Sequence, residues 1–476
     1  MKRGLPVAAL SRRCFHLTVR VALLSLSSLL FTTCALISGE GSANVEVGFF
    51  PDQVIAQSQL ATGATHMQYS LDPGGNPVAL ERGRKALNLA TSYQNQHIMG
   101  FGADNPWPDP NLNDPKRWDW VSLDRRVQLM LETKATPVIT LCCAPTWMVD
   151  STWRSGTDWS KLELAPFPGR EEAFARLSAE VALRYPKVQY FQVWNQFKGL
   201  WNASENSWDV ERYTRLYNKI WKAVKAVRPD AKIGGPYLVL EGSGAGKRLG
   251  YPEDWYTADP ITPRNRAVLE YWLERKLGAD FITIDRSVKT GGDPLSYAES
   301  AQLRLTSLFG DVIRQVRTLR GYRNEPIWMA EYYLAEIPFS VRSEQFQAVM
   351  IASILKHKLE AGLSLSFLWS PEAQPSASIA RAGDGQVLFS STRDADGGRS
   401  SKNLVVYEAF KEYFPPGTAL IRATSSSSSL EVLASKTSLM LINKRPGPTV
   451  VSVPALRAED QQLELAPYEV RVLELP

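Results

Sequence analysis

The chain has 476 residues, of which 44 % are hydrophobic, 22 % charged and 10 % aromatic, and this is too apolar for a disordered protein. Its 31 glycines and 30 prolines exclude collagen-like and low-complexity classes. The net charge of +5 lies mainly in residues 1–43, with five basic residues and one acid, so the nearly neutral remainder argues against a nucleic-acid partner.

Residues 1–43 have the pattern of an export signal. Residues 1–20 are basic and residues 21–38 form an uncharged apolar run, which is the order found in secretory leaders. Residues 11–15, with the sequence SRRCF, resemble the twin-arginine signature. We therefore expect an exported, periplasmic or extracellular protein that is cleaved or, alternatively, tethered to the membrane through an uncleaved or lipidated N-terminus.

Strands and helices are predicted to alternate through the middle of the chain. Eight short apolar runs are typical of strands, and segments with 3.6-residue periodicity separate them. Eight such units over about 300 residues predict a (β/α)8 TIM barrel, with an open doubly wound sheet as the alternative. The predicted strands are residues 65–69, 97–101, 138–143, 188–194, 232–235, 281–285, 327–331 and 363–369.

The two ends of the chain differ from this middle part. Residues 44–64 lack strong periodicity and are interpreted as an N-terminal arm, with a strand of the tail domain as the alternative. The barrel is assigned to residues 65–414. A Pro-Pro-Gly break then precedes apolar, partly alternating runs, which predict a small C-terminal antiparallel β-sandwich over residues 415–476.

Metal and cofactor chemistry is not indicated. Outside the leader the histidines are His66, His97 and His357, and no metal-binding motif contains them, so we expect neither a metal ion nor a cofactor. The adjacent Cys142 and Cys143 lie in an apolar strand. We expect them to be small core residues, with a disulfide between them as the alternative.

In a TIM barrel the chemistry lies at the C-terminal ends of the strands. Aromatic side chains at these ends would form a cleft suited to sugar rings, because the C–H faces of a sugar pack on aromatic planes. This rule selects Glu331 and Gln196, together with the candidate substrate-binding residues Asp104, Trp147, Asn195, Trp201, Tyr237, Asp285, Tyr333 and Trp369.

Several stretches resemble the clan A glycoside hydrolases, specifically family 39, over residues 60–476. The resemblance implies a retaining glycosidase in which a strand-4 Asn-Glu pair supplies the acid/base and a strand-7 Glu is the nucleophile. Glu331 matches the nucleophile, and Asn195 matches the Asn that hydrogen-bonds the sugar 2-hydroxyl. The matching stretches are THMQYSLD (65–72), QNQHIMGFG (94–102), PVITLCCAPTWM (137–148), YFQVWNQFKGLW (190–201), IGGPY (233–237) and WMAEYY (328–333).

The chain departs from this family at the acid/base position, where it has Gln196. A retaining glycosidase uses two carboxyl groups about 5–5.5 Å apart. A carboxamide cannot release a proton near neutral pH, and loss of a positioned acid/base lowers the rate by about 10²–10⁴. The sequence leaves open whether Glu205, Asp285 or Asp104 replaces the missing acid.

Two functions are compatible with these residues, and both have a carbohydrate as partner. The first is an exported glycoside hydrolase acting on a β-linked polysaccharide or oligosaccharide. The second is a catalytically inactive carbohydrate-binding protein on the same scaffold, acting in exopolysaccharide or cell-envelope assembly. The side chain at position 196 is the feature that separates them.

Overall fold

A computed structural model describes most of the chain after the predicted leader. The export signal and Asp104 lie outside the described residues, so the structure does not address them. The described residues are 43–67, 70–98, 118–154, 158–161, 163–240, 260–287, 299–334, 342–375, 386–456 and 461–475.

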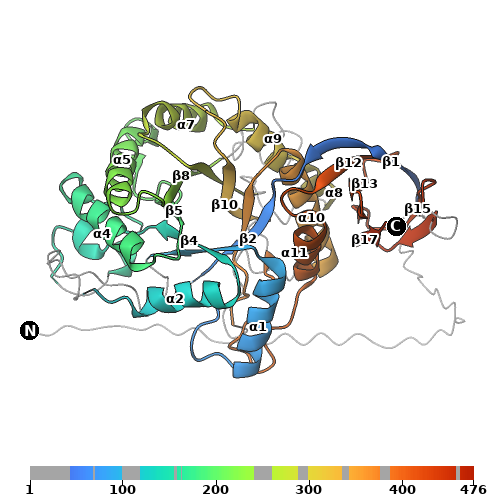
Figure 1. Ribbon diagram of the computed structural model, residues 1–476, viewed down its shortest axis with the longest axis horizontal. Helices are drawn as coiled ribbons and strands as arrows, with labels where there is room; N and C mark the ends of the chain where they lie inside the picture. The colour runs from blue at the N-terminus through green and yellow to red at the C-terminus, as the bar shows by residue number, and fades with distance from the viewer. Residues whose placement is uncertain are drawn as a thin grey trace, which may run out of the picture. The chain divides into compact units, whose positions relative to one another are not determined.

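Eight parallel strands close into a barrel with helices around it, which confirms the predicted TIM barrel (Figure 1). Each strand pairs with the next, and the last pairs with the first. In this order they are β2 (Ala61–Thr65), β3 (Tyr93–His97), β4 (Thr136–Leu141), β5 (Tyr190–Val193), β8 (Lys232–Val239), β9 (Phe281–Ser287), β10 (Ile327–Tyr333) and β11 (Leu365–Trp369).

The first two barrel strands begin earlier than residues 65 and 97, where the sequence places them. β2 is built from small residues, and a Cβ atom on Gly63 would lie 2.6 Å from the ring of Phe367. Small residues at a close approach leave no apolar run to recognise. β3 is not recognised as an apolar run because its buried side chains are polar (Gln94, Asn95, Gln96 and His97).

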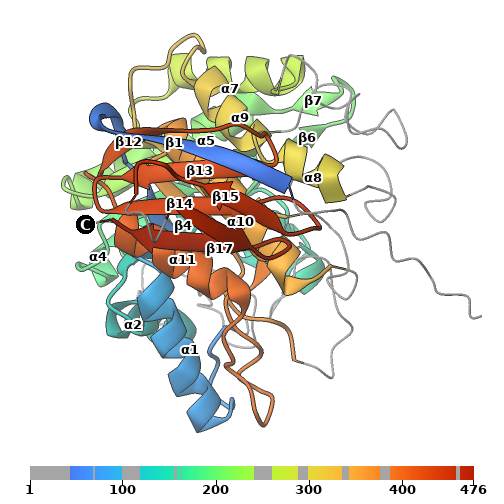
Figure 2. The same cartoon turned by 90° about the vertical axis from the view of Figure 1, so that its right-hand side faces the viewer.

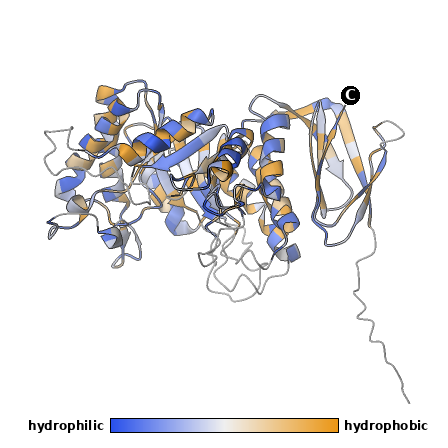
Figure 3. Cartoon of the chain, turned by 90° about the horizontal axis from the view of Figure 1, so that it is seen from below, coloured by the Kyte–Doolittle hydropathy of each residue, from blue (hydrophilic) through white to orange (hydrophobic). Residues whose placement is uncertain are grey.

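Amphipathic helices such as α5 (Val210–Val227) bury one face. In α5 the buried residues Tyr213, Ile220 and Val224 recur at helical spacing, and the Asp209 carboxylate caps its N-terminus by accepting from the Arg212 N–H at 3.0 Å. Figure 3 shows hydrophobic and hydrophilic residues interspersed along these helices. The helices are α1 (Pro77–Ala90), α2 (Val121–Glu132), α3 (Thr146–Val149), α4 (Glu171–Arg184), α5 (Val210–Val227), α7 (Pro263–Arg275), α8 (Glu299–Leu305), α9 (Leu308–Val316), α10 (Glu344–Glu360) and α11 (Lys402–Tyr413).

None of the described helices combines the length and apolar character that crossing a membrane requires. A two-stranded hairpin, β6 (Trp201–Asn202) and β7 (Ser207–Trp208), follows the fourth barrel strand.

A seven-stranded, mainly antiparallel sheet follows the barrel, as the sequence predicts, and Figure 2 shows its strands together. The predicted N-terminal arm contributes to it, because β1 (Ala43–Gln57) pairs with β12 (Ala419–Ser425) and β15 (Thr449–Ser452) and buries Val45 and Val47. The same arm also contains β2, so the barrel begins before residue 65. The other strands are β12 (Ala419–Ser425), β13 (Leu430–Ser435), β14 (Ser438–Asn443), β15 (Thr449–Ser452), β16 (Gln462–Leu465) and β17 (Val470–Glu474).

The barrel interior is filled in layers. Aromatic rings close its lower end, where Phe281 stacks on Trp328 with ring centroids 3.7 Å apart. A polar layer lies above, in which Asn95 donates to Thr65 Oγ1 at 3.1 Å and accepts from Thr140 Oγ1 at 2.8 Å. Because strand side chains alternate, the next inward positions reach the mouth of the barrel.

Cys142 and Cys143 are buried, as the apolar strand predicts, but a disulfide joins them. The interpretation of two unlinked core thiols is therefore wrong, and the alternative applies. The sequence favours unlinked thiols because neither cysteine has a distant partner, whereas the bond forms between neighbours in the chain.

Candidate active site

Glu331 reaches the barrel mouth through an irregularity in β10. Trp328 faces the interior, so strict alternation would turn Glu331 outward. The register between β10 and β9 shifts between Met329 and Glu331, and this places Glu331 opposite Asp285. The shift therefore brings two carboxyl groups to facing positions on neighbouring strands, where Glu331 is 2 % exposed and Asp285 is fully buried.

Hydrogen bonds join the ends of β5, β9 and β10. The Gln196 carboxamide donates to Asp285 Oδ2 and also to the Tyr333 hydroxyl, at 3.2 Å in the second case. That hydroxyl in turn donates to Glu331 Oε2. One phenol oxygen thus lies within hydrogen-bonding distance of both Gln196 and Glu331, which keeps their ends within about 6 Å of each other.

Burial raises the pKa of Glu331, whereas the hydroxyl groups of Tyr237 and Tyr333 and the positive charge of Lys198 oppose that shift. Lys198 follows the fourth barrel strand and binds the Glu163 carboxylate. Hydroxyl donors and a nearby cation favour the ionised carboxylate, which is the form that a nucleophile requires.

The backbone is strained where it positions these groups. Trp194, Gln196 and Phe197 have φ values of 67°, 51° and 54°, and Tyr237 has 59°. Residues other than glycine rarely adopt this left-handed region, and such strain concentrates at functional sites. The turn after β5 therefore holds Trp194, Gln196 and Phe197 in a conformation that local preference alone would not select.

His97 belongs to the same cluster, although the sequence analysis considers it only as a metal ligand. Its Nε2 lies 4.0 Å from Glu331 Oε1, and its ring stacks on Tyr237. Burial and the charge of Lys198 lower the pKa of His97 to about 3, so the imidazole is neutral at neutral pH. Its place at the end of a barrel strand is the signal that could have identified it.

Of the remaining candidates, Trp369 and Asn195 adjoin this cluster, whereas Trp147 and Trp201 have no described contact with Glu331. Trp369 contacts Tyr333 edge-on, with ring centroids 5.2 Å apart, and Asn195 is buried beside Gln196. Trp147, in α3, carries the Arg170 guanidinium 5.3 Å from its ring centroid. Trp201 is 45 % exposed in the β6–β7 hairpin and packs on Trp208. No described contact joins Trp147 or Trp201 to Glu331.

Tyr333→Phe tests the electrostatics of the cluster. The variant loses the hydrogen bond that stabilises ionised Glu331, so the pKa of Glu331 rises further. A hydrogen bond to a charged group contributes about 1.5–3 kcal/mol, which corresponds to about 1–2 pH units. We expect the acidic limb of the kcat/KM profile for an aryl glycoside to move to higher pH by this amount.

The control for this variant is Tyr322→Phe, because Tyr322 donates to the Glu325 carbonyl before β10 begins. An unchanged acidic limb in Tyr333→Phe would contradict the assigned hydrogen bond.

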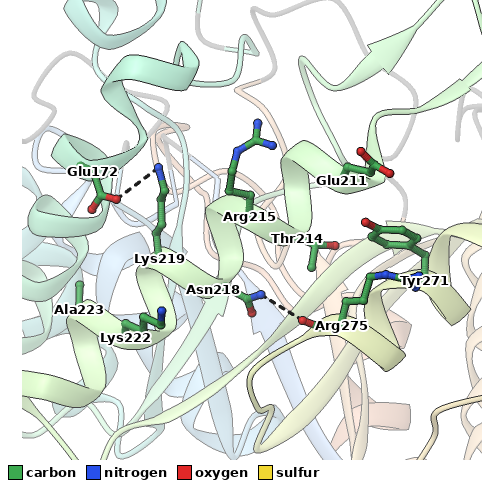
Figure 4. A pocket seen from close by; sticks show the side chains of 10 residues that line it. All are labelled: Glu172, Glu211, Thr214, Arg215, Asn218, Lys219, Lys222, Ala223, Tyr271 and Arg275. Carbon is green, nitrogen blue, oxygen red and sulfur yellow. Dashed lines mark hydrogen bonds and ion pairs between the residues drawn. The ribbon is translucent and has the colours of Figure 1, made fainter.

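The groove between α4, α5 and α7 is a different feature. It encloses about 700 Å³ and is lined by ten residues of these helices, several of them charged (Figure 4). Lys219 pairs with Glu172 at 3.3 Å, and Asn218 donates to the Arg275 carbonyl at 3.1 Å. These four residues are thus paired with one another, and none of the predicted site residues lines the groove. Among the described residues, no cluster of three His, Cys, Asp or Glu could hold a metal ion.

No family model matches the chain, and no curated protein matches it in sequence. Solved structures do match its fold. A conserved exported protein from Bacteroides fragilis superposes with a TM-score of 0.64 at 13 % identity, over 90 % of this chain and 100 % of that one. A GH39 enzyme from Xanthomonas axonopodis pv. citri gives 0.53 at 16 %, over 87 % and 83 %.

A monomeric β-xylosidase from Caulobacter crescentus CB15 gives a TM-score of 0.54 at 14 % identity, over 87 % of this chain and 84 % of that one. The fold is thus shared with a β-xylosidase and a GH39 enzyme. At these identities the likeness establishes the fold, and the chemistry must be argued from the site.

Proposed function

We propose that this chain is an exported retaining glycoside hydrolase acting on β-linked saccharides, with Glu331 as its nucleophile. The observation that carries the proposal is the buried Glu331 carboxylate at the barrel mouth, which accepts from Tyr333 beside Gln196. The shared fold with a β-xylosidase and a GH39 enzyme supports the same reaction class.

The proposed reaction begins with a sugar seated over the strand ends. Trp369, packed against Tyr333, would offer an aromatic face to the ring, and we expect the buried Asn195 to hydrogen-bond the 2-hydroxyl. A Glu331 carboxylate oxygen attacks the anomeric carbon, and the aglycone departs with the bonding electron pair. Water then displaces Glu331 from the glycosyl-enzyme, so the product retains its configuration.

The test uses a substrate whose leaving group departs without protonation by an acid. We expect wild-type protein to release 2,4-dinitrophenolate from its β-D-xyloside or β-D-glucoside, because that leaving group departs unprotonated. Rapid-mixing absorbance would record this release. If neither compound is cleaved above the rate in buffer, the glycosidase proposal is wrong.

The second candidate function, carbohydrate binding without catalysis, is favoured by one observation. The position that the resemblance to family 39 assigns to the proton donor holds Gln196, and a carboxamide cannot supply a proton. Calorimetric binding of xylan without cleavage of either activated glycoside would support this candidate.

A further inference from the structure

Asp285 is the carboxyl group that the fold brings to Gln196. Side chains of β9 alternate, so Asp285 shares the inward face with Thr283 and with Phe281, whose ring lies inside the barrel. Its Oδ2 accepts from the Gln196 carboxamide. Its Oδ1 and the Oε1 atom of Glu331 are both buried and accept no side-chain hydrogen bond among the described residues, so either carboxyl group has an oxygen that can carry a proton.

The other two carboxyl candidates do not have this position. Glu205 is exposed in the turn between β6 and β7, and Asp104 lies outside the described residues. Only Asp285 among the described candidates contacts position 196 and faces Glu331 across paired strands.

Two buried carboxyl groups at facing positions cannot both be ionised at low cost. Burial and the charge of Glu331 raise the pKa of Asp285 well above its ordinary value, although the Gln196 amide, the Arg286 backbone and the Lys358 cation oppose this. Burial also raises the pKa of Glu331, but two tyrosine hydroxyls and Lys198 oppose this rise. The Tyr333 hydroxyl donates to Glu331 and favours its ionised form, so we place the proton of the pair on Asp285.

We infer that Asp285 is the general acid and base of this site, in place of the carboxyl that position 196 lacks; the inference rests on the proposed glycosidase function. Gln196 is then a positioning residue. Its amide nitrogen donates to Oδ2, so in this arrangement the proton of Asp285 lies on Oδ1. A glutamate at position 196 could donate this hydrogen bond only when protonated.

The proton balance of the two steps is complete. As Glu331 bonds to the anomeric carbon, the glycosidic bond breaks and its electron pair passes to the leaving oxygen, which takes the Asp285 proton. In the second step the Asp285 carboxylate removes a proton from water, the water oxygen bonds to the anomeric carbon, and Glu331 departs as a carboxylate. Asp285 ends protonated, as it began.

Asp285→Asn tests the inference, with phenyl and 2,4-dinitrophenyl β-D-xylosides as probes. Phenolate is a poor leaving group, so we expect kcat/KM for the phenyl xyloside to fall by about 10²–10⁴. The dinitrophenolate burst should stay within about tenfold of wild type, because this first step needs no acid. Steady-state turnover should be slow and should rise with added azide, which attacks the glycosyl-enzyme without a base and gives the β-xylosyl azide.

A purely structural role for Asp285 would not give this pattern. The matched control is Glu205→Gln, which should leave both substrates at wild-type rates. Equal losses on both substrates without azide rescue, or an unchanged phenyl xyloside rate, would overturn the assignment to Asp285.

The wild-type protein provides a second measurement that does not depend on how the variant folds. With a proton donor present, kcat/KM across a series of aryl xylosides should depend only weakly on leaving-group pKa, and a steep dependence would overturn the inference. A different result would refute the proposed glycosidase function itself, namely that wild-type protein releases no dinitrophenolate at all.

Discussion

Glu331→Gln is expected to lower turnover of activated and unactivated aryl glycosides alike, by at least about 10⁴-fold. The carboxamide keeps the shape of the side chain but is a poor nucleophile, so no glycosyl-enzyme forms even when the leaving group needs no acid. Stopped-flow measurement of dinitrophenolate release would show the loss of the burst.

The equal loss on both substrates separates Glu331 from Asp285, whose substitution should spare the activated substrate. Because Tyr333 can also donate to an amide oxygen, we expect Glu331→Gln to fold normally. Glu205→Gln is the control for a carboxyl lost outside the cluster. A Glu331→Gln burst of wild-type size would contradict the role assigned to Glu331.

The second large effect concerns the attachment of the sheet to the barrel. Glu431, in β13, accepts from Ser353 Oγ of α10 at 2.8 Å, and its other oxygen lies 3.3 Å from His357 Nε2 and binds Lys444. Burial alone would raise the pKa of Glu431, but the His357 hydrogen bond and the charges of Lys444, His357 and Lys356 outweigh it and hold the pKa well below its usual range.

Glu431→Gln is therefore expected to lower the free energy of unfolding by about 3 kcal/mol, because it leaves partly buried cations without their counter-charge. Since the pKa is lower in the folded state, the stabilisation is present above the unfolded pKa of about 4.3 and is lost as the pH falls below it. Urea unfolding at pH 7 and at low pH would measure both values.

Glu464→Gln is the matched control, because Glu464 is exposed on β16 of the same sheet and should change stability by no more than about 0.5 kcal/mol. If Glu431→Gln lowers the free energy of unfolding no more than Glu464→Gln does, or by an amount independent of pH, this carboxylate does not anchor the sheet to α10.

Much of the fold could be predicted because it depends on local patterns. Apolar runs separated by amphipathic helices predict eight β/α units, and strand ends predict the edge where Glu331, Gln196 and Tyr237 lie. The N-terminal strand β1 could be suggested only as an alternative, because residues after Phe50 are exposed and do not alternate, and its pairing partners are hundreds of residues away.

The contacts within the site could not be predicted in the same way. The inward orientation of Glu331 depends on a register shift next to Met329, which no local pattern signals. The hydrogen bond from Gln196 to Asp285 joins strands that are not neighbours in the chain, so the sequence could propose three replacement carboxyls without ranking them by contact. The sequence does not mark His97 as a site residue, because a lone histidine in a polar strand resembles an ordinary buried residue.

The central claim is that Glu331 forms a covalent bond with a sugar, and trapping that intermediate tests it most directly. A fluorine at C2 destabilises the oxocarbenium-like transition states, and a dinitrophenyl leaving group restores the first step, so the glycosyl-enzyme accumulates. After incubation with 2,4-dinitrophenyl 2-deoxy-2-fluoro-β-D-xyloside, we expect the protein mass to increase by one fluoroxylosyl group, located by peptide fragmentation on Glu331. An unmodified protein that still releases dinitrophenolate, or a label on Asp285, would contradict the account.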